Sequence, residues 1–253
     1  MMSELSQPGR PRRPAPIWQA GEVVEVVVET PETSSLRIQL PQPEPFLPGQ
    51  YYNIRIPVVG RPRPIQRAYS VGSSPHPRFD VIEVGVKEME GGLVSPVLVR
   101  ECPVGSILEV RGPYGAFTWT EEEGGPVLLI GAGSGVVPLM AMIRYQVSKG
   151  TTVPMHLVFS SKSAEYVIYR DELSTLAHQY DWLQVTHTFT RETDNPLARY
   201  HRRIDKEMVE EVFVETAPKL AYLCGPPEMV DDCERSLLEL GLEPDVIKTE
   251  KYD

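Results

Sequence analysis

In the first half of the chain, apolar and polar residues alternate in short segments, which are separated by turns rich in proline and glycine. Alternation with a period of two is typical of strands that bury one face. Six strands are expected, over residues 20–29, 35–40, 51–56, 65–72, 79–87 and 106–112. This spacing predicts an antiparallel six-stranded β-barrel, interrupted by a helical segment at residues 91–99.

The pattern changes after residues 121–126, a polar stretch without periodicity that we interpret as a linker. Apolar runs, typical of strands buried on both faces, then alternate with helical patterns. Five strands are expected at 127–130, 153–159, 183–189, 220–224 and 246–248, and helices at 139–148, 169–178, 206–214 and 228–240. The alternation predicts a doubly wound α/β domain with a five-stranded parallel sheet.

A chain of 253 residues has room for two domains, since single domains usually span roughly 100–200 residues. We expect a barrel domain at residues 17–120 and an α/β domain at residues 127–253, on either side of the linker. Residues 1–16 are rich in proline and arginine, which predicts a disordered leader.

Composition and charge restrict the partners and the compartment. A net charge of −10 argues against nucleic acid and anionic membranes as main partners. No apolar run approaches the roughly 20 residues that cross a bilayer, and no secretory signal is recognisable, so a cytoplasmic location is expected.

The three cysteines, Cys102, Cys224 and Cys233, are widely spaced. This spacing predicts neither a disulfide framework nor a zinc site. A plant-type iron–sulfur cluster needs four cysteines, so these residues cannot supply one. We expect no metal site, and any one-electron centre would belong to another protein.

Arg67-Ala68-Tyr69-Ser70 is the first segment that indicates chemistry. A guanidinium group binds phosphate or pyrophosphate, a tyrosine lies flat against a planar ring, and a serine hydroxyl donates to a ring nitrogen. Together these groups indicate a nucleotide-like cofactor. The alternative is an ordinary edge strand with surface side chains.

Two glycine-containing segments are candidate anion sites. Gly91 and Gly92 precede the short helix, which could instead serve only to plug one mouth of the barrel. Residues 131–138 follow a predicted buried strand and precede a helix, as a pyrophosphate-binding loop does. Val136 stands where the common dinucleotide fingerprint has glycine, so a tight strand–helix turn is the alternative.

Cys224 ends a predicted strand at the edge of the sheet where ligands bind in open α/β folds. Gly225 keeps the approach to this edge clear, and Pro227 suits the first turn of a helix. A ligand-facing role for Cys224 and a buried strand end both agree with the local pattern, whereas Cys233 is expected in the core.

Six segments resemble, in order, the motifs of the ferredoxin–NADP reductase superfamily. They are Pro48-Gly49-Gln50-Tyr51, Arg67-Ala68-Tyr69-Ser70, Gly92-Leu93-Val94-Ser95, Gly112-Pro113-Tyr114-Gly115, the loop 131–138 and Cys224-Gly225-Pro226-Pro227-Glu228-Met229. The resemblance covers residues 17–253. It implies a barrel that binds FAD, a second domain that binds NAD(P)H, and a flavin ring between the two.

The resemblance also implies residue roles. By this resemblance, Arg67 and residues 92–95 would bind the pyrophosphate of FAD, and Tyr69 and Tyr252 would lie against the flavin ring. The loop 131–138 would bind the nicotinamide nucleotide. The catalytic residues implied are Ser70, Cys224 and Glu250. The cofactor-binding residues implied are Arg67, Ala68, Tyr69, Ser70, Gly91, Gly92, Leu93, Val94, Ser95, Tyr252, Gly131, Gly133, Ser134, Gly135, Val136, Pro138, Arg191, Cys224, Gly225, Pro226 and Met229.

Ser160-Ser161-Lys162 stands where an NAD-specific site often has an acidic residue, and Arg191 lies in a segment that resembles an NADPH phosphate site. These features favour NADPH over NADH, although both cations also suit solvated loops. We expect an NAD(P)H-dependent reductase that passes single electrons to a separate protein, such as ferredoxin, flavodoxin or an oxygenase component. The alternatives are a free-standing reductase of flavins or quinones and an electron-transfer subunit of a larger complex.

Overall fold

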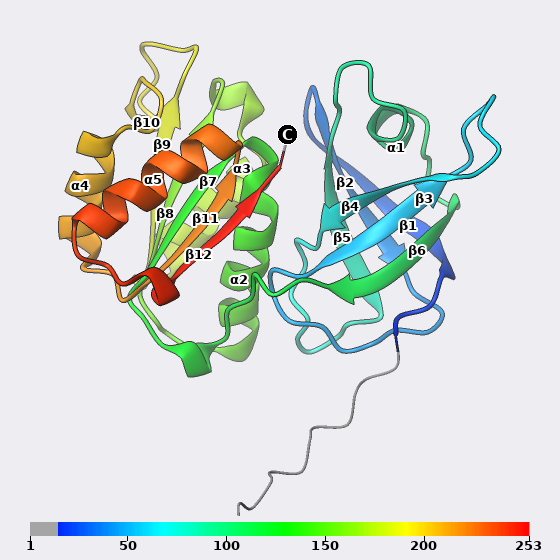
Figure 1. Cartoon of the computed structure of the whole chain (residues 1–253), viewed down its shortest axis with the longest axis horizontal. Coiled ribbons are helices and arrows are strands. Elements are labelled where there is room, and N and C mark those ends of the chain that lie inside the picture. Colours follow the sequence, from blue (N-terminus) through cyan, green and yellow to red (C-terminus); the bar gives the residue numbers. More distant parts are fainter. Residues whose placement is uncertain (1–14, 253) are drawn as a thin grey trace, which may run out of the picture.

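The computed structural model describes residues 15–252 and contains two lobes, each built around one six-stranded sheet (Figure 1). The predicted leader lies outside the described residues except for its last two positions, 15 and 16. The first lobe holds β1 Gln19–Thr30, β2 Thr33–Gln39, β3 Tyr51–Ile56, β4 Ile65–Ser70, β5 Val81–Lys87 and β6 Ile107–Tyr114. Neighbouring strands are antiparallel, in the order β4-β3-β6-β1-β2-β5.

This sheet closes into a barrel because its edge strands meet. An antiparallel bridge joins Val71, directly after β4, to Val84 in β5. The inner wall follows from alternation, since Tyr52, Ile54 and Ile56 of β3 are buried while the residues between them are half-buried. The predicted six-stranded antiparallel barrel is confirmed.

A short helix, α1 Ser95–Arg100, lies across one end of the barrel (Figure 1). Val94 and Leu98 are buried in the same core cluster as the strands. The helix begins later than expected because Gly91 has a φ of +71° and the N–H of Gly92 donates to the Met89 carbonyl over 2.9 Å. Residues 89–92 therefore form a turn ahead of the helix.

The second lobe is a parallel sheet covered by helices. Its strands are β7 Val127–Ala132, β8 Met155–Ser161, β9 Leu183–Phe189, β10 Ala198–Tyr200, β11 Leu220–Gly225 and β12 Ile247–Lys251, in the order β10-β9-β8-β7-β11-β12. Its helices are α2 Val136–Lys149, α3 Arg170–Gln179, α4 Lys206–Thr216 and α5 Pro227–Glu239. All paired strands run parallel.

The expected five-stranded sheet is wrong by one strand. The sixth strand, β10, is three residues long and pairs with β9 at the edge of the sheet, with an irregular register. Three residues are too few to show a period, so the sequence pattern gave no signal for it.

The second sheet is doubly wound, as predicted. Leu129 and Leu157 pack on one face in the cluster that contains the α2 and α3 side chains. Leu128 and Val158 pack on the other face with side chains of α4 and α5. Alternate residues of each central strand thus point to opposite helix layers, which explains the continuous apolar runs.

Residues 121–126 connect the two lobes and are anchored to both sides of the connection. Glu121–Glu123 form one 3₁₀ turn, and the indole N–H of Trp119 donates to the Gly124 carbonyl over 3.1 Å. The Tyr222 hydroxyl donates to Glu123 Oε2 over 3.0 Å. Within residues 15–252, no helix is both long and apolar enough to span a membrane.

Candidate cofactor-binding clefts and active site

Two clefts lie where the lobes meet, and both receive side chains from each lobe. The first cleft has a volume of about 860 Å³. It is lined by Tyr51, Arg67, Ala68, Tyr69, Ser70, Gly85, Lys87, Met89, Gly92, Leu93, Val94, Ser95, Ser134, Val137, Pro226, Pro227, Glu250, Lys251 and Tyr252. Cavities of roughly 300–1,000 Å³ are typical of small-molecule and cofactor sites.

Arg67 presents a free guanidinium group to the first cleft. β4 is an edge strand that pairs along its length with β3 alone, so Arg67 is exposed. Its Nη1 donates to the Gln66 carbonyl over 2.8 Å, and no carboxylate of residues 15–252 forms an ion pair with it. An arginine without a carboxylate partner is available to a phosphate.

Tyr69 lies on the same strand, two residues further on, and packs against the barrel core. Burial raises the pKa of its phenol to about 12, so it stays neutral at physiological pH. A neutral, half-buried aromatic ring at the wall of a cleft is suited to stacking on a flat ligand ring.

The turn before α1 also lines the first cleft. A Cβ on Gly92 would stand 2.9 Å from the Met89 carbonyl oxygen, so this position requires glycine. The Met89 N–H donates to Ser95 Oγ over 3.0 Å, which leaves the Ser95 hydroxyl hydrogen free for a ligand in the cleft.

Glu250 comes to the first cleft from the C-terminal strand β12. It is the register partner of Cys224 on β11, and its Oε1 accepts a hydrogen bond of 3.3 Å from the Ser70 hydroxyl. Burial raises the pKa of Glu250, and the hydrogen bond from Ser70 offsets only part of this rise. Ser70 and Glu250 therefore form a polar contact between the lobes in the lining of the cleft.

Tyr252 contacts the loop at residues 131–138, which we call the glycine loop. Its hydroxyl donates to the Ala132 carbonyl and accepts from the Gly135 N–H. Burial raises the pKa of this phenol. Tyr252 also packs against the core cluster that contains Cys224, so the C-terminal segment covers the loop and the strand end together.

Cys224 is 1% exposed and lines neither cleft. Burial raises the pKa of its thiol well above the usual value, and the nearby Glu250 carboxylate adds to the rise. The sulfur is therefore a thiol rather than a thiolate, and it lies in the core cluster against which Tyr252 packs.

The second cleft has a volume of about 410 Å³ and lies beside the glycine loop. Gly133 takes a φ of +53°, and a Cβ on Gly135 would stand 2.1 Å from the Cys224 carbonyl oxygen. These glycines therefore allow the loop to fold tightly against β11. Ser161 Oγ is buried at the cleft wall and has no hydrogen-bond partner within residues 15–252, as expected of a group that meets a polar ligand.

Cations from both lobes reach the second cleft. Lys87 of the barrel lies with its Nζ 3.8 Å from where a Gly133 Cβ would be, and it lines both clefts. Burial lowers the pKa of Lys87, and Lys162 lowers it further. Lys162 is paired with Glu32 of the β1–β2 hairpin, and Arg203 also lines the cleft.

The structure brings most, but not all, of the sequence-predicted residues to the clefts. In the first cleft are Arg67, Ala68, Tyr69, Ser70, Gly92, Leu93, Val94, Ser95, Ser134, Pro226, Glu250 and Tyr252. Gly133, Pro226 and Met229 line the second. Gly91, Gly131, Gly135, Val136, Pro138, Arg191, Cys224 and Gly225 line neither. Val136 and Pro138 bury their side chains.

Sequence reasoning missed Lys87, Glu32 and Arg203. Lys87 ends β5, and its apparent role there was that of a polar strand end. Arg203 follows the unpredicted strand β10. No local pattern marks a barrel residue as part of a cleft in the second lobe, so only the three-dimensional arrangement identifies Lys87 and Glu32.

The two clefts together suit a dinucleotide pair. The first offers a free guanidinium, an aromatic ring, hydroxyls and a glycine turn, which fit the pyrophosphate and flat ring of FAD. The second offers a glycine loop ahead of α2, an unpartnered hydroxyl and cations, which fit a nicotinamide nucleotide. Pro226 and Lys87 line both, so the two ligands would meet.

The sequence matches two known families. Residues 20–119 match the oxidoreductase FAD-binding domain, and residues 129–235 match the oxidoreductase NAD-binding domain. The matched regions correspond to the two lobes.

Full-length relatives extend these matches. Ferredoxin–NADP reductase B of Sorangium cellulosum is 33% identical over 217 residues, which is 82% of this chain and 86% of that protein. The reductase component of the naphthalene 1,2-dioxygenase/salicylate 5-hydroxylase systems of Ralstonia sp. is 28% identical over 92% of this chain and 68% of its own length. The propane 2-monooxygenase reductase component of Gordonia sp. is 28% identical, and the match spans 60% of its length.

Solved structures agree with this assignment. The ferredoxin reductase of carbazole 1,9a-dioxygenase superposes with a TM-score of 0.80 at 29% identity, over 94% of this chain and 70% of that one. The chain belongs to the ferredoxin–NADP reductase superfamily. It is an FAD- and NAD(P)H-dependent flavoprotein oxidoreductase, as predicted.

Proposed function

We propose that this oxidoreductase takes hydride from NADPH and passes single electrons to a separate redox protein, such as a ferredoxin, a flavodoxin or an oxygenase component. The observation that carries the proposal is the meeting of the two clefts at Pro226 and Lys87, with Ser70 and Glu250 in contact at the first cleft. Bound FAD would accept two electrons as hydride and release them one at a time.

The protein's own contribution is binding and orientation. Residues 17–120 would form the FAD-binding domain and residues 127–253 the NAD(P)-binding domain. Arg67 and the turn at residues 92–95 would bind the FAD pyrophosphate, and Tyr69 would lie along the flavin ring. The Ser70 hydroxyl, which donates to Glu250 in this structure, would turn its single hydrogen from Glu250 to the flavin nitrogen that receives hydride.

In the second cleft, backbone N–H groups of the glycine loop and the Lys87 ammonium would bind the pyrophosphate of the nicotinamide nucleotide. Arg203 and Lys162, which line this cleft, would supply positive charge for the additional phosphate of NADPH, and Arg191 is near enough to Glu32 to lower the pKa of that carboxyl. Of these, Lys162 is neutralised by Glu32, so NADPH would have to compete with that carboxylate.

Tyr252 would respond to the nucleotide. Its hydroxyl is hydrogen-bonded to the Gly135 N–H and the Ala132 carbonyl, which belong to the loop that would bind pyrophosphate. Nicotinamide would therefore reach the flavin only after Tyr252 leaves this position. Cys224, in the core cluster against which Tyr252 packs, would then lie near the nicotinamide.

A protein acceptor is supported by the relatives, which are named as ferredoxin reductases and oxygenase reductase components. Arg61 and Arg63 are exposed between β3 and β4 at one end of the barrel, and this basic edge is suited to an acidic partner despite the negative net charge. Arg55, on the neighbouring strand, is paired with Glu109 and adds little to this edge.

The decisive experiment is anaerobic titration of the purified protein with NADPH and with NADH, followed through the visible spectrum of FAD. Bleaching by NADPH, followed by reoxidation with a ferredoxin at substoichiometric concentration, is the expected result. A colourless protein that takes up no FAD would refute the proposal, and turnover with free flavins or quinones but no protein acceptor would favour a small-molecule reductase. Size-exclusion chromatography of native complexes would reveal a larger assembly.

A further inference from the structure

We infer that Arg144 is a positioning residue for hydride transfer: it holds the helix that carries the dinucleotide loop at a fixed place against the flavin-binding strand. The inference rests on the proposed function and concerns a side chain that lines neither cofactor cleft. Arg144 lies two turns into α2, and its contacts reach the barrel and the neighbouring helix α3.

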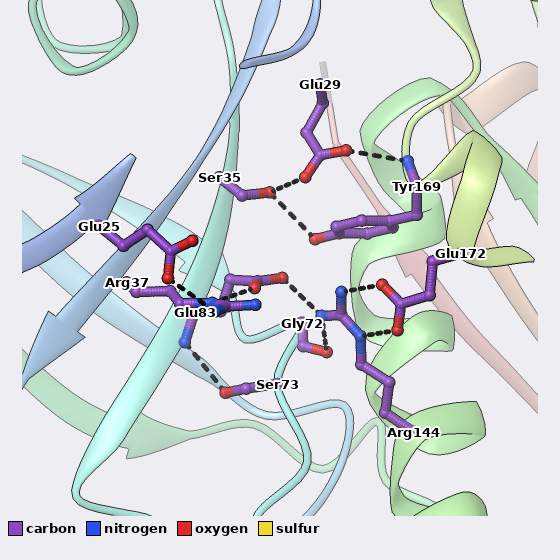
Figure 2. A network of polar contacts seen from close by, with 10 residues as sticks. All are labelled: Glu25, Glu29, Ser35, Arg37, Gly72, Ser73, Glu83, Arg144, Tyr169 and Glu172. Carbon is purple, nitrogen blue, oxygen red and sulfur yellow. Dashed lines mark hydrogen bonds and ion pairs between the residues drawn. The ribbon is translucent and has the colours of Figure 1, made fainter. Parts of the chain in front are cut away.

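All three nitrogens of the Arg144 guanidinium donate hydrogen bonds (Figure 2). Nη1 donates to the Gly72 carbonyl over 2.8 Å and to Glu83 Oε1 over 2.5 Å, both in the barrel. Nε and Nη2 donate to the two carboxylate oxygens of Glu172 on α3, over 2.8 and 2.6 Å. The same group lies over the ring of Tyr169, 4.5 Å from its centroid. Lysine cannot reproduce these four directed contacts.

Glu83 is a buried carboxylate, so breaking its ion pair with Arg144 would be energetically costly. Its side chain is 4% exposed, and its second oxygen accepts from Arg37 Nε over 3.0 Å. Burial alone would raise its pKa, but the charge and hydrogen bonds of Arg144 and Arg37 outweigh burial and lower it. Removing Arg144 would leave an ionised carboxylate between the lobes with one partner only.

Side-chain packing, like the ion pairs of Arg144, holds α2 against the barrel. Val137, in the first turn of α2, lies in a notch left by two barrel glycines: a Cβ on Gly85 would stand 2.4 Å from Val137 Cγ2, and one on Gly72 would stand 3.3 Å from Val137 Cγ1. The notch permits close approach but does not fix the rotation of the helix about Val137. Arg144, two turns further along, supplies the second fixed point.

Arg144 joins the segment at Gly72 to helix α2, and each of these lies next to residues that line a cofactor cleft. Gly72 follows Ser70 by two residues, and its N–H donates to the Glu83 carbonyl over 2.8 Å, so the strand segment after Ser70 is fixed to the Arg144 partner. At the other end, α2 begins directly after Gly133–Gly135. A tilt of α2 would therefore change the separation between the dinucleotide loop and Ser70. Misplacement by about 1 Å can slow a reaction by roughly 100-fold.

The test compares Arg144→Gln and Arg144→Lys with a control, Arg170→Gln, in which the arginine is exposed and, among residues 15–252, pairs only with its neighbour Asp171. Stopped-flow absorbance would measure flavin reduction at saturating NADPH, and the long-wavelength absorbance of nicotinamide stacked on flavin would report their approach. We expect reduction to slow by roughly 10- to 100-fold in Arg144→Gln and by less in Arg144→Lys, with weaker stacking absorbance. FAD content, nucleotide affinity and reoxidation by the acceptor should remain as in the wild type, as should all properties of Arg170→Gln.

Two results would overturn the inference. One is reduction at the wild-type rate in both Arg144 variants. The other is a loss confined to FAD content or melting temperature, while the FAD-loaded fraction is reduced at the normal rate. If Arg144→Gln does not fold, Arg144→Lys alone decides between these outcomes, because it retains the charge opposite Glu83. Failure of the proposed function would be recognised separately, since NADPH would then not reduce the wild-type protein.

Discussion

The Ser70 hydroxyl lies 3.3 Å from Glu250 Oε1, across 180 residues of sequence. This hydrogen bond joins the flavin-binding strand of the barrel to the last strand of the α/β lobe. It places a hydroxyl and a buried carboxyl side by side at the first cleft. The geometry of this pair gives the first prediction.

Ser70→Ala should slow flavin reduction by about tenfold or more, because it removes a hydroxyl that lines the first cleft and leaves Glu250 without this hydrogen-bond donor. FAD affinity should change little, since Arg67 and the turn at residues 92–95 remain. Stopped-flow reduction by NADPH measures the rate, and fluorescence titration measures FAD binding. Ser74→Ala is the control, because that hydroxyl contacts Ser148 and the His76 carbonyl instead. Reduction at the wild-type rate would remove Ser70 from the catalytic residues.

Cys224→Ala should slow flavin reduction by roughly tenfold without preventing FAD binding, since the side chain lies in the core cluster against which Tyr252 packs, near where nicotinamide would enter. Cys233→Ala is a matched control: its thiol is equally buried but lies in the core between α5 and the sheet. Both variants should lose a similar amount of stability, which thermal unfolding would measure. Equal reduction rates in the two variants would contradict a role for Cys224.

Glu250→Gln should change the pH dependence of stability. Burial raises the folded-state pKa of Glu250 above its usual 4.5, so the folded protein retains this proton to higher pH than the unfolded chain does. The carboxyl's contribution to the unfolding free energy is therefore fully present below pH 4.5 and is lost as pH rises through the folded pKa. As pH rises through the folded pKa, the unfolding free energy of Glu250→Gln should increase relative to that of the wild type, because glutamine has no carboxyl group to ionise.

Melting temperatures of both proteins across the acidic and neutral range provide the measurement. Glu243→Gln is the control, because Glu243 is exposed and forms no ion pair among residues 15–252. A constant difference between the Glu250→Gln and wild-type curves would show that this carboxyl titrates normally.

Tyr252→Phe should bind NADP⁺ more tightly than the wild type. The phenol hydroxyl contacts Gly135 and Ala132, and these contacts must break before the loop binds a nucleotide. Two hydrogen bonds of about 1 kcal/mol net each set an upper limit on the gain, and about tenfold in Kd is expected. Isothermal titration calorimetry with NADP⁺ measures it. An unchanged or higher Kd would mean that Tyr252 does not compete with the nucleotide.

Glu32→Gln should increase the preference for NADPH over NADH. Its hydrogen bond with Lys162 lowers the pKa of Glu32, so the carboxylate is ionised and neutralises the lysine. Without that charge Lys162 is free to bind the additional phosphate, which would raise the NADPH/NADH ratio of kcat/KM by about fivefold. Glu165→Gln, an exposed neighbour on the same surface, should leave the ratio unchanged. A ratio unaffected by Glu32→Gln would exclude Lys162 as a phosphate ligand.

Local periodicity was sufficient to predict the barrel, the doubly wound domain and the four long helices, because each element signals its buried face within its own residues. β10 gave no such signal, since three edge residues cannot show a period. Motif order was sufficient to identify Arg67, Tyr69 and Ser70 as cleft residues, and the structure brings all of them to one wall.

The contacts between lobes could not be read from the sequence. Glu32 with Lys162 and Glu83 with Arg144 join residues that lie 130 and 61 positions apart, one in the barrel lobe and one in the α/β lobe. Arg191 was expected in the second cleft, but Arg203 lines it instead. Backbone hydrogen bonds from Thr190 to Ser161 and from Arg191 to Lys162 fix this turn, and a motif gives no information about where such a turn directs its side chains.

The glycine notch that receives Val137 restricts how the two halves of such a protein can be exchanged. A barrel from a relative that carries alanine in place of Gly85 would meet this valine at 2.4 Å, before any cofactor contact is considered. Chimeric reductases built to transfer coenzyme preference would therefore need to exchange positions 72, 85 and 137 as one set. Recombination inside that set would yield hybrids whose halves each fold but dock out of alignment.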